Sequence, residues 1–214
     1  SIGAMVGPEA FMEVRYLAHA KQMQALELIP QLAEEFKKGF GRESGGLIRS
    51  YSTDDAETIV VAMGSILGTI KDVVDEMRSA GEKIGVLGIT SYRPFPIDAV
   101  REALKNAKRV VVLEKSLAVG LGGILASDIR KSLRKLPIDV FTVIAGLGGR
   151  AITKKSLHGV FEKVAKEEVE SVTFLDLDWG VVNRQLERER QTRRSGPAAE
   201  SMLRDIGTVA SKIA

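Results

Sequence analysis

The chain has 214 residues, of which 31 are basic and 28 acidic, giving a formal net charge of +3. This balance argues against nucleic acid as a partner, and the lack of cysteine excludes disulfides, a thiol nucleophile and cysteine-ligated metal clusters on this chain. No apolar run reaches the roughly 18 residues that cross a membrane, and the start resembles no signal peptide. We therefore expect a cytoplasmic location. Because position 1 is Ser, we also expect a processed product or an excised part of a longer chain.

The first segment, residues 9–38, is predicted to be a long amphipathic helix. Its apolar stripe consists of Met12, Tyr16, His19, Met23 and Leu26. Pro8 suits a first helical turn, whereas Pro30 is expected to kink or break the helix because it lacks a backbone donor. Gly39 and Gly41 are expected to end it. Such an arm usually packs on its own domain or on a neighbouring one.

The second segment, residues 55–178, alternates strands with helices. The predicted strands are 58–63, 83–90, 109–113, 139–145 and 171–177. The predicted helices are 66–79, 97–107, 124–136 and 153–165, with Thr153 as a cap. Residues 58–63 form a continuous apolar run, which is typical of a strand buried on both faces. This order predicts an α/β fold with a parallel five-stranded sheet and helices on both faces.

The third segment begins with a run of arginine and glutamate from Arg184 to Arg194, which favours a solvated helix or a docking arm. After Ser195–Pro197, helical spacing returns at Met202, Leu203, Ile206, Val209 and Ile213. The predicted organisation is therefore a helical connector (1–50), an α/β domain (51–180) and a charged helical tail (181–214).

Parallel sheets bind ligands beyond the carboxyl ends of their strands, so the loops there carry the candidate residues. Gly64 and Ser65 follow the first strand, but the complete dinucleotide fingerprint is missing and no acidic residue ends the second strand. Close packing is therefore favoured for Gly64. Arg93 lies in a rigid Arg-Pro-Phe-Pro loop and suits a carboxylate or phosphate, although an interface or structural role is favoured.

Two glycine-rich loops follow later strands. Lys115 and Ser116 precede Gly122 and Gly123 at a helix start, which would suit an anion, although no Walker motif is present. Arg150 follows a second Gly-Leu-Gly-Gly run and is expected to face solvent or a partner. The glycines of both runs suit turns with positive φ.

No catalytic set emerges from the remaining residues. His19 and His158 lie on different predicted helices without acidic partners at metal spacing. Asp176 and Asp178 would point to the same face of a strand end, but nothing completes a metal site around them. We predict neither catalytic residues nor a metal site on this chain.

Taken together, the motifs resemble the α subunit of 2-oxoacid:ferredoxin oxidoreductases. They comprise residues 8–16, 46–48, 55–57, 60–65, 92–96, 113–116, 120–123 and 144–150. Their order and spacing agree with the pattern of pyruvate:ferredoxin oxidoreductase, and the likeness extends over residues 8–178.

The resemblance implies a transketolase C-terminal-like domain at residues 55–178. The family oxidises a 2-oxoacid with thiamine diphosphate, Mg²⁺, [4Fe–4S] clusters and coenzyme A or a related acceptor, and passes electrons to ferredoxin or flavodoxin. Its pyrimidine-binding thiamine domain normally precedes the connector, where this chain begins. We therefore expect this chain to bind no cofactor alone and to be inactive in isolation. It would serve as an assembly domain for the thiamine- and cluster-binding subunits, with the loop residues named above in cleft or interface contacts.

Two alternatives remain open. One is a domain of another thiamine enzyme, either a transketolase or a 2-oxoacid dehydrogenase β component, although the Arg-Pro-Phe-Pro and Gly-Leu-Gly-Gly-Arg loops argue against it. The other is a free-standing module that binds an anion or coenzyme A through Gly64, Ser65, Lys115 and Gly122.

For the oxidoreductase that the resemblance implies, pyruvate is the default substrate, while oxalate, 2-oxoglutarate and branched-chain oxoacids stay open.

Overall fold

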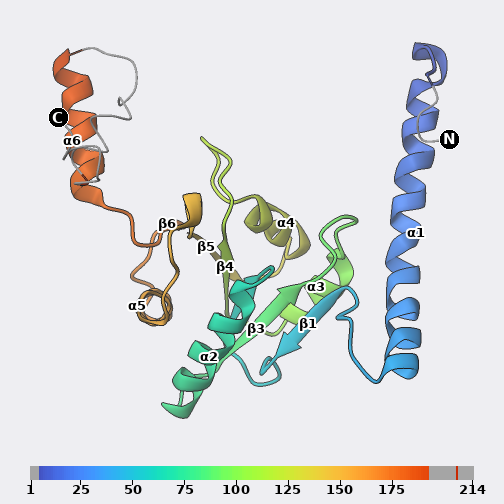
Figure 1. Cartoon of the computed structure of the whole chain (residues 1–214), viewed down its shortest axis with the longest axis horizontal. Coiled ribbons are helices and arrows are strands. Elements are labelled where there is room, and N and C mark those ends of the chain that lie inside the picture. The colour runs from blue at the N-terminus through green and yellow to red at the C-terminus, as the bar shows by residue number, and fades with distance from the viewer. Residues whose placement is uncertain (1–4, 193–205, 207–214) are drawn as a thin grey trace. The chain divides into compact units, whose positions relative to one another are not determined.

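The computed structural model describes residues 5–192 and residue 206 (Figure 1). The chain divides into two compact units at Leu175 and Asp176. The strands of the first unit are β1 (Ile48–Tyr51), β2 (Thr58–Ala62), β3 (Ile84–Ile89), β4 (Arg109–Glu114), β5 (Asp139–Ile144) and β6 (Val172–Phe174). Its helices are α1 (Pro8–Phe40), α2 (Ile66–Ser79), α3 (Ile97–Leu104), α4 (Ile124–Ser132), the 3₁₀ turn η1 (Leu147–Gly149) and α5 (Lys154–Ala165).

The strands form one sheet with the order β1-β3-β2-β4-β5-β6. The strands from β2 to β6 pair in parallel, which confirms the predicted parallel arrangement. The predicted number of five strands is wrong, because β1 adds a sixth that pairs antiparallel with β3, Ile48 lying opposite Ile89. β1 has only four residues, of which the first and last are half-buried and the middle two are exposed. The strand is therefore too short to show the alternation of apolar and polar residues that predicts a strand.

Helices cover both faces of the sheet, as predicted. On one face, α2 and α5 pack on Val60 and Ala62 of β2, while on the other face α4 and α3 pack on Ile59 and Val61. Every residue of β2 and β3 is buried, as expected for central parallel strands. Thr153 caps α5 as predicted, since its Oγ1 accepts a hydrogen bond from the Ser156 amide at 3.1 Å.

Helix α1 runs without interruption from Pro8 to Phe40, so the predicted break at Pro30 is wrong. Pro30 is solvent-exposed, and water can therefore satisfy the carbonyl that loses its intrahelical donor. Gly41 ends the helix in the left-handed conformation (φ 67°), with its amide bonded to the Lys37 carbonyl at 2.8 Å. No residue of α1 is buried, and Met12 and Tyr16 of the predicted stripe are exposed.

The second unit contains α6 (Trp179–Thr192), which agrees with the predicted helix in the arginine–glutamate run. Asp178 caps the N-terminus of this helix, because its Oδ1 accepts a hydrogen bond from the Val181 amide at 3.0 Å. The predicted helical segment from Met202 to Ile213 lies outside the described residues, apart from Ile206.

An exposed ionic network joins α2 to α5 and gives the fold a testable acid dependence. His158 Nε2 lies 2.7 Å from Glu76, and Lys154 lies 3.0 Å from Glu76 and 3.2 Å from Asp72. The hydrogen bond from His158, followed by that from Lys154, lowers the pKa of the Glu76 carboxyl. A lowered folded-state pKa adds stability above the unfolded-state value of about 4.3, and this stability is lost as pH falls through the folded pKa.

We therefore expect Glu76→Gln to destabilise the chain at pH 7 and to lose this effect progressively below pH of about 4.3. Urea unfolding across pH 3–7, roughly the range over which a carboxyl titrates, measures this difference. Glu162→Gln on the exposed side of α5 is the control. A Glu76→Gln penalty that persists unchanged at low pH would contradict the assignment.

Candidate functional site

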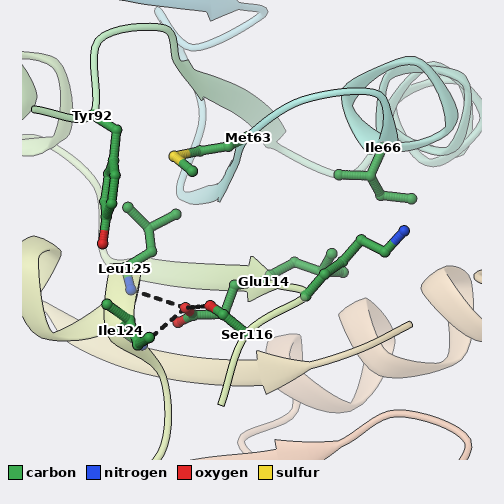
Figure 2. Close-up of a pocket in the computed structure, with 9 residues that line it drawn as sticks. Met63, Ile66, Tyr92, Glu114, Ser116, Ile124 and Leu125 are labelled. Carbon is green, nitrogen blue, oxygen red and sulfur yellow. Dashed lines mark hydrogen bonds between the residues drawn. The ribbon is translucent and has the colours of Figure 1, made fainter. Parts of the chain in front are cut away.

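The carboxyl ends of the parallel strands bring the predicted loops to one edge of the sheet. From β2 the chain continues to β3 on one side, and β4 then lies on the other side of β2. Ligand sites in open α/β sheets lie at such a switch point. A cavity of about 310 Å³ occurs there (Figure 2). It is lined by Met63, Ile66, Tyr92, Leu113, Glu114, Lys115, Ser116, Ile124 and Leu125.

Glu114 is the buried polar centre of this edge. One carboxylate oxygen accepts hydrogen bonds from the Ser116 hydroxyl at 2.6 Å and from the Ile124 and Leu125 amides at 2.9 Å each. The other accepts from the Ala126 amide at 3.0 Å. These amides are the unpaired donors of the first turn of α4, where the helix dipole favours negative charge (Figure 2). Glu114 thus fills the position that a bound anion would take.

The glycines before α4 make this contact possible. Gly122 has φ 115°, a conformation that L side chains rarely adopt. A Cβ on Gly123 would collide with the Glu114 carboxylate and would lie 2.7 Å from Thr142. Ser116, Gly122 and Gly123, predicted as part of an anion cradle, therefore serve a carboxylate of this same chain.

Arg93 is also engaged within the chain. Its guanidinium bonds to Asp128 of α4 at 2.8 Å and to the Tyr92 carbonyl at 2.7 Å. It stacks over the Tyr92 ring at 4.0 Å from the centroid, and Tyr92 meets Phe95 edge to face. Burial, with a further contribution from Asp128, raises the pKa of the Tyr92 hydroxyl, which stays neutral at physiological pH. The favoured role for Arg93, interface or structural, stays a prediction, and these contacts show that its guanidinium is engaged within the chain.

Because a planar guanidinium makes these contacts together, we expect Arg93→Lys to lower the free energy of unfolding by about 0.5–1 kcal/mol. The effect is small because the Arg93 side chain is 53% exposed. Chemical denaturation beside the conservative control Lys131→Arg measures it. A loss as large as that of a buried core residue would contradict a surface ion pair.

The other candidates surround the cavity without forming a polar cluster. Lys115 lines it and is exposed, whereas Gly64, Ser65 and Arg150 are exposed residues outside the lining set. The close packing favoured for Gly64 is wrong, because an added Cβ there would meet nothing within 4 Å; its φ of 76° is what favours glycine in the turn after β2. Sequence reasoning missed Glu114 as a site residue. The sequence does contain a pattern that could have predicted this role. An acidic residue ends a strand, and the helix that follows is preceded by a glycine, which has no side chain to cap it.

The structure also places the residues that were considered for metal binding. His158 contacts Glu76, while Asp178 caps α6. Within residues 5–192 and at residue 206, no group of three or more His, Asp or Glu side chains is arranged to hold a metal ion. Over the same residues, no helix is both long and apolar enough to span a bilayer.

Comparisons with known proteins agree with the motifs. Residues 56–157 match the family Pyruvate:ferredoxin oxidoreductase core domain II. The chain is 43% identical over 184 residues to pyruvate synthase subunit PorA of Methanosarcina barkeri, covering 83% of this chain and 46% of that protein. The corresponding protein of Methanothermobacter thermautotrophicus is 37% identical over 177 residues, covering 83% and 45%.

A third relative, ketoisovalerate oxidoreductase subunit VorA of Pyrococcus horikoshii, is 28% identical over 181 residues, covering 84% of this chain and 46% of that protein. The chain therefore spans about half the length of the curated relatives it matches. The core-domain match and the identity to PorA subunits confirm the resemblance. The chain therefore belongs to the α-subunit branch of the 2-oxoacid:ferredoxin oxidoreductase family.

Proposed function

We propose that this chain is an assembly domain of a 2-oxoacid:ferredoxin oxidoreductase that oxidatively decarboxylates a 2-oxoacid and passes electrons to ferredoxin or flavodoxin. The observation that carries the proposal is 43% identity to a pyruvate synthase subunit along 83% of the chain. The identity to the ketoisovalerate relative is lower, at 28%, which favours pyruvate as the substrate. The proposed location is the cytoplasm.

Two observations, one on the sequence and one on the described residues, argue against a cofactor site on this chain. The sequence has no cysteine for an iron–sulfur cluster. The amides at the start of α4, which would suit a diphosphate, are bonded to Glu114. We therefore propose that thiamine diphosphate, Mg²⁺, [4Fe–4S] clusters and coenzyme A are held by other parts of the complex, and that this chain alone is not catalytic.

The proposed organisation is a connector (1–50), a transketolase C-terminal-like domain (51–180) and a charged tail (181–214). Within it, Gly64, Ser65, Lys115 and Arg150 are proposed to make cleft or interface contacts, since they are exposed at the carboxyl edge of the sheet. Arg93, Ser116, Gly122 and Gly123 would support that edge from within. The partners would be the thiamine-binding and cluster-binding subunits.

Native mass spectrometry of the chain, purified gently from its source cells, tests the proposal. We expect a brown complex with additional subunits that contains thiamine diphosphate and iron, while the separated chain lacks 2-oxoacid oxidation. A colourless monomer of the chain's own mass would overturn the proposal. That result would favour the alternative of a free-standing anion-binding module. Titration of the chain with coenzyme A would then test whether it binds this ligand.

A further inference from the structure

Several large apolar side chains are exposed in the segments that follow the parallel strands β2, β4 and β5. They are Met63 after β2, Val119 and Leu121 after β4, Ile124 at the start of α4 and Leu147 after β5. Val119 is 92% exposed and Leu121 is 73% exposed. Met63 and Ile124 also line the cavity, so part of this apolar rim continues into its wall (Figure 2). Grouped apolar residues of this kind mark interaction sites, whereas single ones are ordinary.

The backbone holds the most exposed of these residues in place. The Ala118 amide bonds to the Gly122 carbonyl at 2.8 Å, and the Gly122 amide returns a bond of 2.8 Å to the Ala118 carbonyl. Val119 and Leu121 lie on the tight turn between them. The turn ends at Gly122, directly before Gly123 and the first turn of α4, whose amides bond to the buried Glu114 carboxylate. These bonds fix the position of the turn.

The cavity offers an apolar wall rather than free polar groups. Its buried carboxylate, Glu114, is already bonded to Ser116 and to the amides of α4. The Tyr92 hydroxyl lies 3.4 Å from the guanidinium of Arg93. The rest of the lining, apart from the exposed Lys115, is aliphatic or methionine. An apolar side chain suits this cavity better than an anion does.

The charged side chains in the loops that follow β2 to β5 are basic. The loops that follow β2, β3, β4 and β5 contain Arg93, Lys115 and Arg150 and no acidic residue. Arg93 bonds to Asp128 of α4, and the side chains of Lys115 and Arg150 are both solvent-exposed. An occupant with complementary charge therefore carries carboxylates beside its apolar residue.

We propose that the rim of Met63, Val119, Leu121, Ile124 and Leu147 docks an acidic segment of a partner subunit, which inserts one apolar side chain into the cavity. The inference rests on the proposed function, because that function supplies partner subunits to an otherwise exposed surface.

Site-specific photo-cross-linking in the intact complex tests this docking. Benzoylphenylalanine is placed at position 121 in the source cells, and at position 131, in the last turn of α4, as the control. Position 121 is expected to cross-link to one oxidoreductase subunit, in a peptide that contains Asp or Glu beside an apolar residue. Position 131 is expected to give at most a background yield.

Charge reversal provides an independent measurement on the same complex. Lys115→Glu is expected to weaken subunit association roughly tenfold, and Leu121→Ser to weaken it by a similar factor, whereas Lys131→Glu leaves it unchanged. The side chains of Lys115 and Leu121 are both exposed, so the variants are expected to fold. An intact complex with no cross-link at 121, or with a cross-link to a lipid or a basic peptide, overturns the docking proposal and leaves the proposed function standing. A chain recovered alone overturns the proposed function, and the docking proposal with it.

Discussion

Replacing Glu114 with glutamine is expected to lower the free energy of unfolding by about 2–3 kcal/mol. The wild-type carboxylate accepts from the amides of Ile124, Leu125 and Ala126 and from the Ser116 hydroxyl. Glutamine keeps one oxygen but places an NH₂ group against backbone donors, and it removes the negative charge from the helix N-terminus. Because the residue is only 6% exposed, water cannot replace the lost acceptor.

Urea denaturation of the wild-type chain and the Glu114→Gln variant measures this loss through the shift of the midpoint at constant slope. Glu102→Gln is a matched control, since the Glu102 side chain on α3 is 72% exposed and pairs with Lys105, the residue that follows the helix. The control is expected to change stability by no more than about 0.5 kcal/mol. Equal shifts in the two variants would show that Glu114 does not anchor α4.

The centre of the sheet could be predicted from the sequence because β2 and β4 are runs of mostly apolar residues. The runs at residues 58–63 and 109–113 correspond closely to β2 and β4. β1 escaped prediction because an edge strand of four residues depends on pairing with β3, which its own sequence does not reveal. Likewise, Pro30 predicts a break only where the freed carbonyl cannot find another donor.

The sequence predicted which loops meet at the carboxyl edge of the sheet, but it did not predict the hydrogen bonds between them. Sequence spacing correctly assigned Lys115, Ser116 and Gly123 to one edge, because all parallel strands end there. It could not show that Glu114 occupies the donors of α4, since the bonded amides lie ten to twelve residues further along the chain. A glycine-rich helix start predicts that an acceptor is nearby, whether from a ligand or from the protein itself.

The second large effect is expected at Gly123, where alanine should lower the free energy of unfolding by about 2–3 kcal/mol. The backbone there has φ −77° and ψ 142°, which any residue adopts, so the penalty arises from space alone. The added methyl would collide with the Glu114 carboxylate, which cannot move without breaking its bonds to α4. Thr142, on the other side, is fully buried and leaves no room for the methyl to shift.

Gly68→Ala is the matched control, because Gly68 lies in α2 and an added Cβ there meets nothing within 4 Å. Alanine at that position is expected to stabilise the chain by about 0.5–1 kcal/mol, opposite in sign to Gly123→Ala. A double-mutant cycle then separates the two neighbours of Gly123. In a Glu114→Ala background the carboxylate is gone, so Gly123→Ala should cost at least about 1 kcal/mol less than in the wild type. If Gly123→Ala lowers the free energy of unfolding equally in both backgrounds, the clash with Thr142 alone causes the loss. In that case glycine at position 123 is not required by the Glu114 carboxylate.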